Sequence, residues 1–150
     1  MATVLVIGAS GFVGRRLAVA LLAAGYTVRC LARDPAEVAE LGRAGCDIVQ
    51  GDMLDADSIS RATVGVNAIY LSVHTLSKQP ASSGGRFMDA ERQGVANVIT
   101  AARGRGVRRV IYVTSVGVSP DGPGEWLRER CGPSECSSTA VWTRRSSDPA

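Results

Sequence analysis

The stretch VLVIGASGFVGRRL, residues 4–17, joins a short apolar run to a glycine-rich turn and then to a helical pattern. The run that ends at Ile7 is β-branched and apolar, which is typical of a strand buried on both faces. Of the three glycines that follow, the first permits a tight turn, the second lets the backbone approach a pyrophosphate, and the third lets the helix pack closely. The helix start would then offer free N–H groups and its positive dipole end to phosphate. The predicted dinucleotide-binding residues in this stretch are Gly8, Ser10, Gly11, Phe12, Val13 and Gly14.

Strand and helix patterns alternate along the rest of the chain. Strands are predicted at 3–7, 27–32, 47–50, 67–72 and 107–114, and helices at 12–24, 35–43, 56–62 and 86–103. This alternation predicts βαβ units and a parallel sheet. Because crossovers are right-handed, strand order 3-2-1-4-5 is the natural arrangement. We therefore expect an α/β fold over residues 1–130, with a Rossmann-type doubly wound parallel sheet.

The last twenty residues, 131–150, differ in composition from the rest of the chain. They contain seven Ser or Thr residues and two prolines, with no helical or strand periodicity. We expect this tail to be disordered and the sheet to be truncated before strand six. One alternative is a shifted reading frame, since an allowed GC-rich codon spelling gives RTERVLLDSGLDATVIRPG in its place. The other is a tail that has simply diverged.

Composition excludes several classes of function. The 150 residues suit one domain, and a net charge of +3 is too small to indicate nucleic acid or an anionic membrane as a partner. The arginines from Arg103 to Arg109 form a basic cluster where a helix is expected to end. Cations are favourable there because they interact with the negative end of the helix dipole. The four cysteines show no metal-ligand spacing, so no metal is expected, and Cys30 falls within an apolar strand. The longest apolar stretch, 17–25, is too short to span a bilayer, and we expect a cytoplasmic protein.

The end of the second strand bears on the choice of cofactor. An acid there binds the ribose 2′-hydroxyl of NAD, whereas an arginine accommodates the 2′-phosphate of NADP. The segment LARDP places Arg33 at this position, with Asp34 directly after it. Arg15, at the start of the first helix, could add positive charge nearby. NADP(H) is therefore preferred over NAD(H), and an exposed arginine without a ligand is the alternative.

Residues 1–130 resemble the atypical short-chain dehydrogenase/reductases, close to the NmrA-like and extended NAD(P)-dependent epimerase/dehydratase branches. The motifs that carry the resemblance are IGASGFVG, LARDP, QGDMLD, IYLSVH and VIYVTSVG. The resemblance implies that Asp52 binds the adenine amino group and that Met53 flanks the adenine ring. It also implies that Ser72 and Val73 border the nicotinamide ribose. His74, which follows them, is either a proton donor near the nicotinamide or an ordinary loop residue.

The sequence departs from the resemblance at the catalytic residues. Hydride-transferring members use a tyrosine, a lysine four residues later, and a serine at the end of strand five. Ser115 is the candidate catalytic serine, but Trp126 and Arg130 stand at the four-residue spacing. An indole cannot exchange a proton at a substrate oxygen. Three functions follow as alternatives: an NADPH-dependent reductase or isomerase of an unknown small molecule, a non-catalytic NADP-sensing regulator of the NmrA type, or an inactive truncated product.

Overall fold

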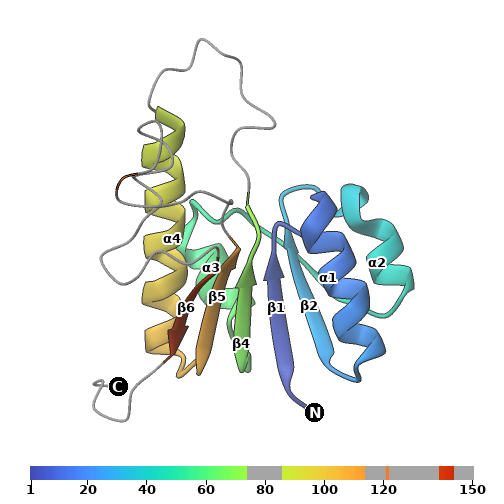
Figure 1. Ribbon diagram of the computed structural model, residues 1–150. Coiled ribbons are helices and arrows are strands. Elements are labelled where there is room, and N and C mark those ends of the chain that lie inside the picture. Colours follow the sequence, from blue (N-terminus) through green and yellow to red (C-terminus); the bar gives the residue numbers. More distant parts are fainter. Residues whose placement is uncertain (74–85, 114–120, 122–138, 144–150) are drawn as a thin grey trace.

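The computed structural model describes residues 1–73, 86–113, 121 and 139–143 (Figure 1). Within these residues one sheet is formed by β1 (Thr3–Ile7), β2 (Thr27–Ala32), β3 (Asp47–Gln50), β4 (Ala68–Leu71), β5 (Arg109–Val113) and β6 (Thr139–Thr143). The strand order is β3-β2-β1-β4-β5-β6, and every pairing among β1 to β5 is parallel. The prediction of a parallel sheet in the order 3-2-1-4-5 is confirmed, with strand ends within two residues of those expected.

Helices cover both faces of the sheet (Figure 1). They are α1 (Phe12–Ala23), the 3₁₀ helix η1 (Pro35–Val38), α2 (Ala39–Arg43), α3 (Ala56–Ala62) and α4 (Arg86–Gly104). The α1 and α2 side encloses a core that includes Val6, Val28 and Cys30. The α3 and α4 side encloses a larger core built around Leu5, Ile69 and Val98. Burial on both faces explains why the strands read as continuous apolar runs.

The helix expected over 35–43 is divided into two shorter pieces, η1 and α2. The side chain of Asp34 caps η1 by accepting a hydrogen bond from the backbone N–H of Ala36 at 2.9 Å. Pro35 occupies the first helical position, where its missing N–H costs no hydrogen bond. The cap fixes where the chain turns after β2.

The prediction of a disordered tail over 131–150, with the sheet ending at five strands, is wrong for Thr139–Thr143. These residues form β6 antiparallel to β5, with Trp142 opposite Val110 and Val141 opposite Ile111. Two physical reasons account for the strand. An unpaired edge of β5 would leave backbone N–H and C=O groups without partners, and the sequence TAVWT is rich in residues that favour strands. The remainder of the tail lies outside the described residues, and a shifted reading frame stays a prediction.

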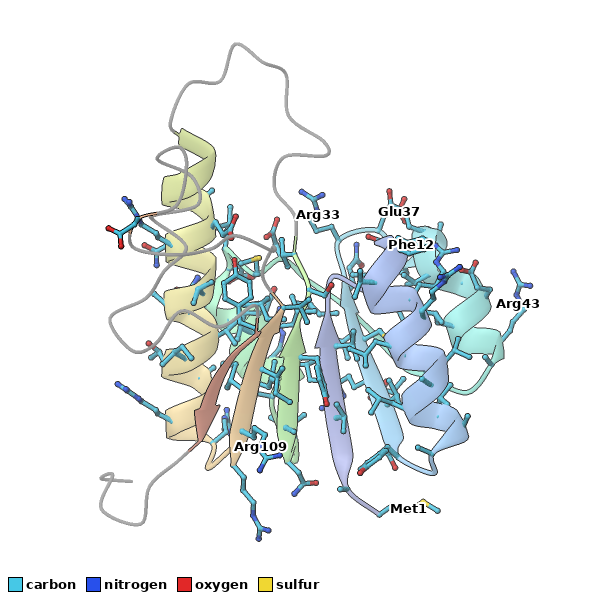
Figure 2. All side chains as sticks on the ribbon, viewed as in Figure 1. Met1, Phe12, Arg33, Glu37, Arg43 and Arg109 are labelled. Carbon is cyan, nitrogen blue, oxygen red and sulfur yellow. The ribbon has the colours of Figure 1, made fainter. Side chains whose placement is uncertain are left out.

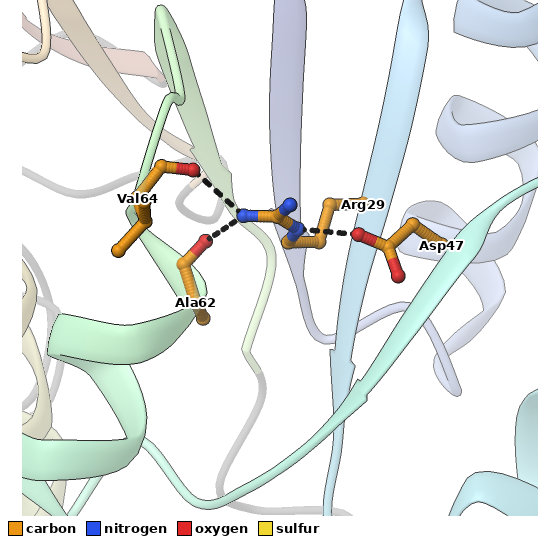
Figure 3. Close-up of polar contacts among 4 residues, drawn as sticks. All are labelled: Arg29, Asp47, Ala62 and Val64. Carbon is orange, nitrogen blue, oxygen red and sulfur yellow. Dashed lines mark hydrogen bonds and ion pairs between the residues drawn. The ribbon is translucent and has the colours of Figure 1, made fainter.

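An arginine ties the sheet together at the amino ends of its strands (Figure 3). Nε of Arg29 in β2 donates to a carboxylate oxygen of Asp47 in β3 at 2.6 Å. Nη1 of the same side chain donates to the carbonyl oxygens of Ala62 and Val64, at 3.0 and 2.8 Å. Arg29 therefore joins two strands to the end of α3 and the turn beyond it. We call this set of contacts the Arg29 clamp.

None of the helices in the described ranges is long and apolar enough to cross a membrane. In the same ranges, no three His, Cys, Asp or Glu side chains are grouped so that they could hold a metal ion.

Candidate functional site

The predicted site residues come together at the carboxyl edge of the sheet. Gly8 follows β1, Arg33 follows β2, Asp52 lies just beyond β3, and Ser72 follows β4. Because these four strands are parallel and adjacent, their carboxyl ends form one continuous edge. Figure 2 shows Arg33 and Phe12 at this edge, whereas Met1 and Arg109 lie at the opposite, amino end. In doubly wound sheets, ligands bind along the carboxyl edge.

Gly8 and Gly14 are required by close packing within the protein. Gly8 has a φ of +92°, and a β-carbon there would lie 2.1 Å from the carbonyl oxygen of Ser72. A β-carbon on Gly14 would lie 2.2 Å from the carbonyl oxygen of Gly8. The turn therefore packs against the end of β4, and α1 packs against the turn. Both contacts agree with the roles that the sequence predicts for the first and third glycines.

Gly11 differs from its two neighbours in the motif. It has an extended backbone with a φ of −82°, and a β-carbon there would meet only the carbonyl oxygen of Gly8, at 3.3 Å. Gly11 is the N-cap of α1, no side chain caps the helix, and its first turn holds no acidic residue. Ser10, Phe12 and Val13 beside it are exposed. An anion at this point would meet unpaired backbone N–H groups and the positive end of the helix dipole.

Arg33 is exposed directly after β2, and its side chain extends beyond the carboxyl edge (Figure 2). Its side chain has no hydrogen-bond or ion-pair partner in the part of the chain that the structure describes. The neighbouring acid, Asp34, is engaged as the cap of η1 through the N–H of Ala36. The end of β2 therefore presents a cation, and the carboxylate of the next residue accepts a backbone hydrogen bond.

Arg15 lies at the start of α1, and its side chain is bound by the η1–α2 segment. Its Nη2 donates to the backbone carbonyl oxygen of Glu37 at 2.9 Å, and its guanidinium pairs with the carboxylate of Glu40 in α2. These contacts join α1 to the η1–α2 segment. Because Glu40 offsets its charge, the expectation that Arg15 adds free positive charge beside Arg33 is not supported.

The segment after β3 leads into α3 and is held by α4, which covers the same face of the sheet. Asp52 is half-buried, and its Oδ1 accepts a hydrogen bond from the N–H of Leu54 at 3.0 Å. Met53 is also half-buried and lies against Gly94, where an added β-carbon would come within 2.0 Å of its Cε. Asn97 donates to the carbonyl oxygens of Met53 and Leu54, at 3.0 and 3.1 Å. Sequence reasoning missed Asn97, because no local pattern marks a partner more than forty residues away.

Two further side chains near the edge were not predicted. The hydroxyl of Tyr112 in β5 donates to the carboxylate of Glu91 in α4, which is only 4% exposed. Ser72 and Val73 are half-buried at the end of β4, and their place beside a ligand stays a prediction. The remaining candidates, His74, Ser115, Trp126 and Arg130, lie outside the described residues.

Comparison with known proteins matches residues 8–141 to a family described as NAD(P)H-binding. Sterol demethylase protein B of Methylococcus capsulatus is 37% identical over 125 residues, covering 80% of this chain and 37% of that protein. Cinnamoyl-CoA reductase 1 of Oryza sativa subsp. japonica is 37% identical over 121 residues, covering 76% of this chain and 34% of that protein. The chain thus spans about a third of the length of these curated relatives.

Among solved structures, the chain is similar to a short-chain dehydrogenase/reductase superfamily protein from Agrobacterium tumefaciens with bound NAD. The TM-score is 0.66 at 31% identity, and the match covers 82% of this chain and 35% of the other. The family match begins at Gly8, includes the segments after β2, β3 and β4, and ends inside β6.

Proposed function

This chain belongs to the NAD(P)H-binding family and has the fold of the short-chain dehydrogenase/reductases, and from this premise we propose that it binds NADP(H) in preference to NAD(H). The observation that carries the proposal is the arrangement at the end of β2. Arg33 is exposed without a side-chain partner in the described ranges, and the Asp34 carboxylate caps η1. A dinucleotide whose pyrophosphate meets Gly11 would bring its adenosine ribose to the end of the neighbouring strand, β2.

The charges at this position favour a 2′-phosphate. A guanidinium forms charge-assisted, forked hydrogen bonds with phosphate oxygens, and it offers no acceptor to a ribose hydroxyl. An acid that binds the 2′-hydroxyl would instead repel the phosphate.

Titration of NADPH and NADH by fluorescence tests this preference. Arg33→Ala is expected to weaken NADPH binding about tenfold or more while leaving NADH binding unchanged, because only the phosphate contact is lost. The matched control is Arg43→Ala, which removes an exposed arginine from the end of α2, away from Arg33 (Figure 2). Equal affinity of the wild type for NADPH and NADH would contradict the proposal.

We further propose that the chemistry is reduction of a small molecule that the sequence does not identify. When bound, NADP(H) supplies hydride transfer. Ser72 and Val73 would border the nicotinamide ribose, and Ser115 would contact the substrate oxygen. The support is that the curated relatives include a reductase, named for cinnamoyl-CoA, with 37% identity over the matched part.

A non-catalytic, NADP-sensing regulator is the second candidate, favoured by Trp126 and Arg130 at the spacing of the tyrosine and lysine. Oxidation of NADPH in the presence of quinones, aldehydes and ketones separates the candidates. Turnover that disappears in Gly11→Val supports the reductase, whereas tight NADPH binding without turnover supports the regulator. A folded chain that binds neither dinucleotide would identify an inactive product.

We also propose a reducing, cytoplasmic setting. Cys30 and Cys46 are buried free thiols, and neither forms a disulfide. Thiols persist in this state where the compartment keeps them reduced.

A further inference from the structure

We propose that Asn97 of α4 is a positioning residue that makes the site select a 6-aminopurine, adenine, over a 6-oxopurine. This inference rests on the proposed function, and it concerns a residue outside the glycine turn and the strand ends. With pyrophosphate at the end of β1 and ribose at the end of β2, the base that the ribose carries continues toward the end of β3.

The segment at the end of β3 presents a carboxylate that can recognise an amino group. Oδ1 of Asp52 accepts the N–H of Leu54, and its other oxygen has no partner within the described residues. An ionised carboxylate accepts hydrogen bonds and donates none. It would therefore bind the 6-amino group of adenine and repel the 6-carbonyl oxygen of hypoxanthine. Recognition of this kind depends on where the carboxylate is held.

Asn97 fixes that position through the backbone. Its Nδ2 donates to the carbonyl oxygens of both Met53 and Leu54, and the N–H of Leu54 in turn bonds Asp52. The Asn97 amide is itself oriented by Gln93, whose Nε2 donates to Asn97 Oδ1 at 3.0 Å. A continuous chain of hydrogen bonds thus runs from α4 to the Asp52 carboxylate.

Packing holds the same segment at a second point. Met53 lies against Gly94, one turn before Asn97 on α4, in a space that a β-carbon would fill. The segment is therefore fixed both by a side-chain contact and by two carbonyl contacts. Without Asn97, the Met53 contact would remain, but the Met53–Leu54 peptide, whose N–H bonds Asp52, and the Leu54–Asp55 peptide after it would each lose a bond to α4.

The test compares two ligands that differ only at position 6 of the purine: NADPH and reduced nicotinamide hypoxanthine dinucleotide phosphate. The wild type is expected to bind NADPH about tenfold or more tightly, the range of one charge-assisted hydrogen bond. In Asn97→Asp, which keeps the side-chain size but replaces the donors with acceptors, this ratio is expected to fall toward about one. The ratio of NADPH to NADH affinity, which reports Arg33, should stay at the wild-type value.

Two companion variants separate positioning from stability. Ser60→Ala removes the hydrogen bond that Ser60 of α3 accepts from Arg105, the residue after α4, and should leave purine selectivity unchanged. Gln93→Ala leaves both donors of Asn97 intact but removes the hydrogen bond that orients its amide group. This variant should therefore lower purine selectivity in part, and it supplies a test even if Asn97→Asp does not fold. Wild-type selectivity in folded Asn97→Asp or in Gln93→Ala, with NADPH binding intact, would overturn this inference alone. Failure of the wild type to bind any dinucleotide would overturn the proposed function and this inference with it.

Discussion

Gly14 lies so close to Gly8 that a β-carbon on Gly14 would come within 2.2 Å of the Gly8 carbonyl oxygen. This oxygen also accepts the N–H of Gly11 at 3.0 Å, so it is fixed by the turn and cannot move aside freely. The first and third glycines of the motif are therefore structural requirements of this chain. Gly11, with a nearest contact of 3.3 Å, is not equally constrained.

Gly14→Ala is expected to lower the free energy of unfolding by about 1–3 kcal/mol, because the added methyl group overpacks a rigid turn. Urea unfolding measures the change. Gly104→Ala is the matched control: it ends α4, nothing lies within 4 Å of its added β-carbon, and its stability should stay the same or rise. A Gly14→Ala protein as stable as the wild type would show that the turn can yield.

Gly11→Ala is expected to keep the fold and lose the ligand. The alanine suits a φ of −82°, and only a small shift of the Gly8 oxygen is needed. The methyl group would nevertheless stand where the pyrophosphate approaches, so NADPH affinity should fall about tenfold or more. Fluorescence titration and urea unfolding of the same sample separate the two effects. Unchanged affinity would mean that the phosphate binds elsewhere.

Arg29→Met is expected to destabilise the protein by about 2–3 kcal/mol, since it leaves the Asp47 carboxylate and the carbonyls of Ala62 and Val64 without their donor. Arg29→Lys should recover only part of the lost stability, because an ammonium group cannot make the same set of hydrogen bonds as the planar guanidinium. Arg109→Met, at an exposed arginine of β5, should change stability little. Thermal and urea unfolding report the ranking, and equal losses for Arg29→Met and Arg109→Met would refute the role of the clamp.

Stability is expected to decline in alkaline solution because of Cys30. The pKa of the Cys30 thiol lies well above its ordinary value. Burial is the main cause, and the neighbouring Cys46 raises this pKa further. The folded state therefore keeps a proton that the unfolded state releases above about pH 8.5, and the free energy of unfolding falls as pH rises from there. The loss approaches about 1.4 kcal/mol per pH unit for one thiol.

Urea unfolding at pH 7.5, 9 and 10, with a reductant present, measures this decline. Cys30→Ala should show a shallower pH dependence than the wild type, whatever its stability at neutral pH. Identical slopes for the two proteins would show that Cys30 does not contribute.

The strands and the glycine turn could be predicted because their signals are local. The run from Thr3 to Ile7 and the spacing of Gly8, Gly11 and Gly14 are contained within a dozen residues. In the same way, LARDP places Arg33 at a strand end, and the structure has it there. The unpredicted features pair residues that are far apart in the chain: Asn97 with Met53, Tyr112 with Glu91, and Arg29 with Ala62. Strand β6 was missed for a related reason, because the free edge of β5 supplies its partner and composition alone indicated disorder.

The Arg29 clamp and the loops at the carboxyl edge occupy opposite ends of the same strands. A substitution at position 33 alters an exposed side chain that has no hydrogen-bond or ion-pair partner among the described residues, and it removes none of the contacts of the clamp. With the role proposed for Arg33, related proteins could change their dinucleotide preference through surface residues without losing the stabilising contacts of the clamp. Because the stabilising contacts lie at the amino ends of the strands and the loops lie at the carboxyl ends, the loops can change in evolution while the fold stays stable.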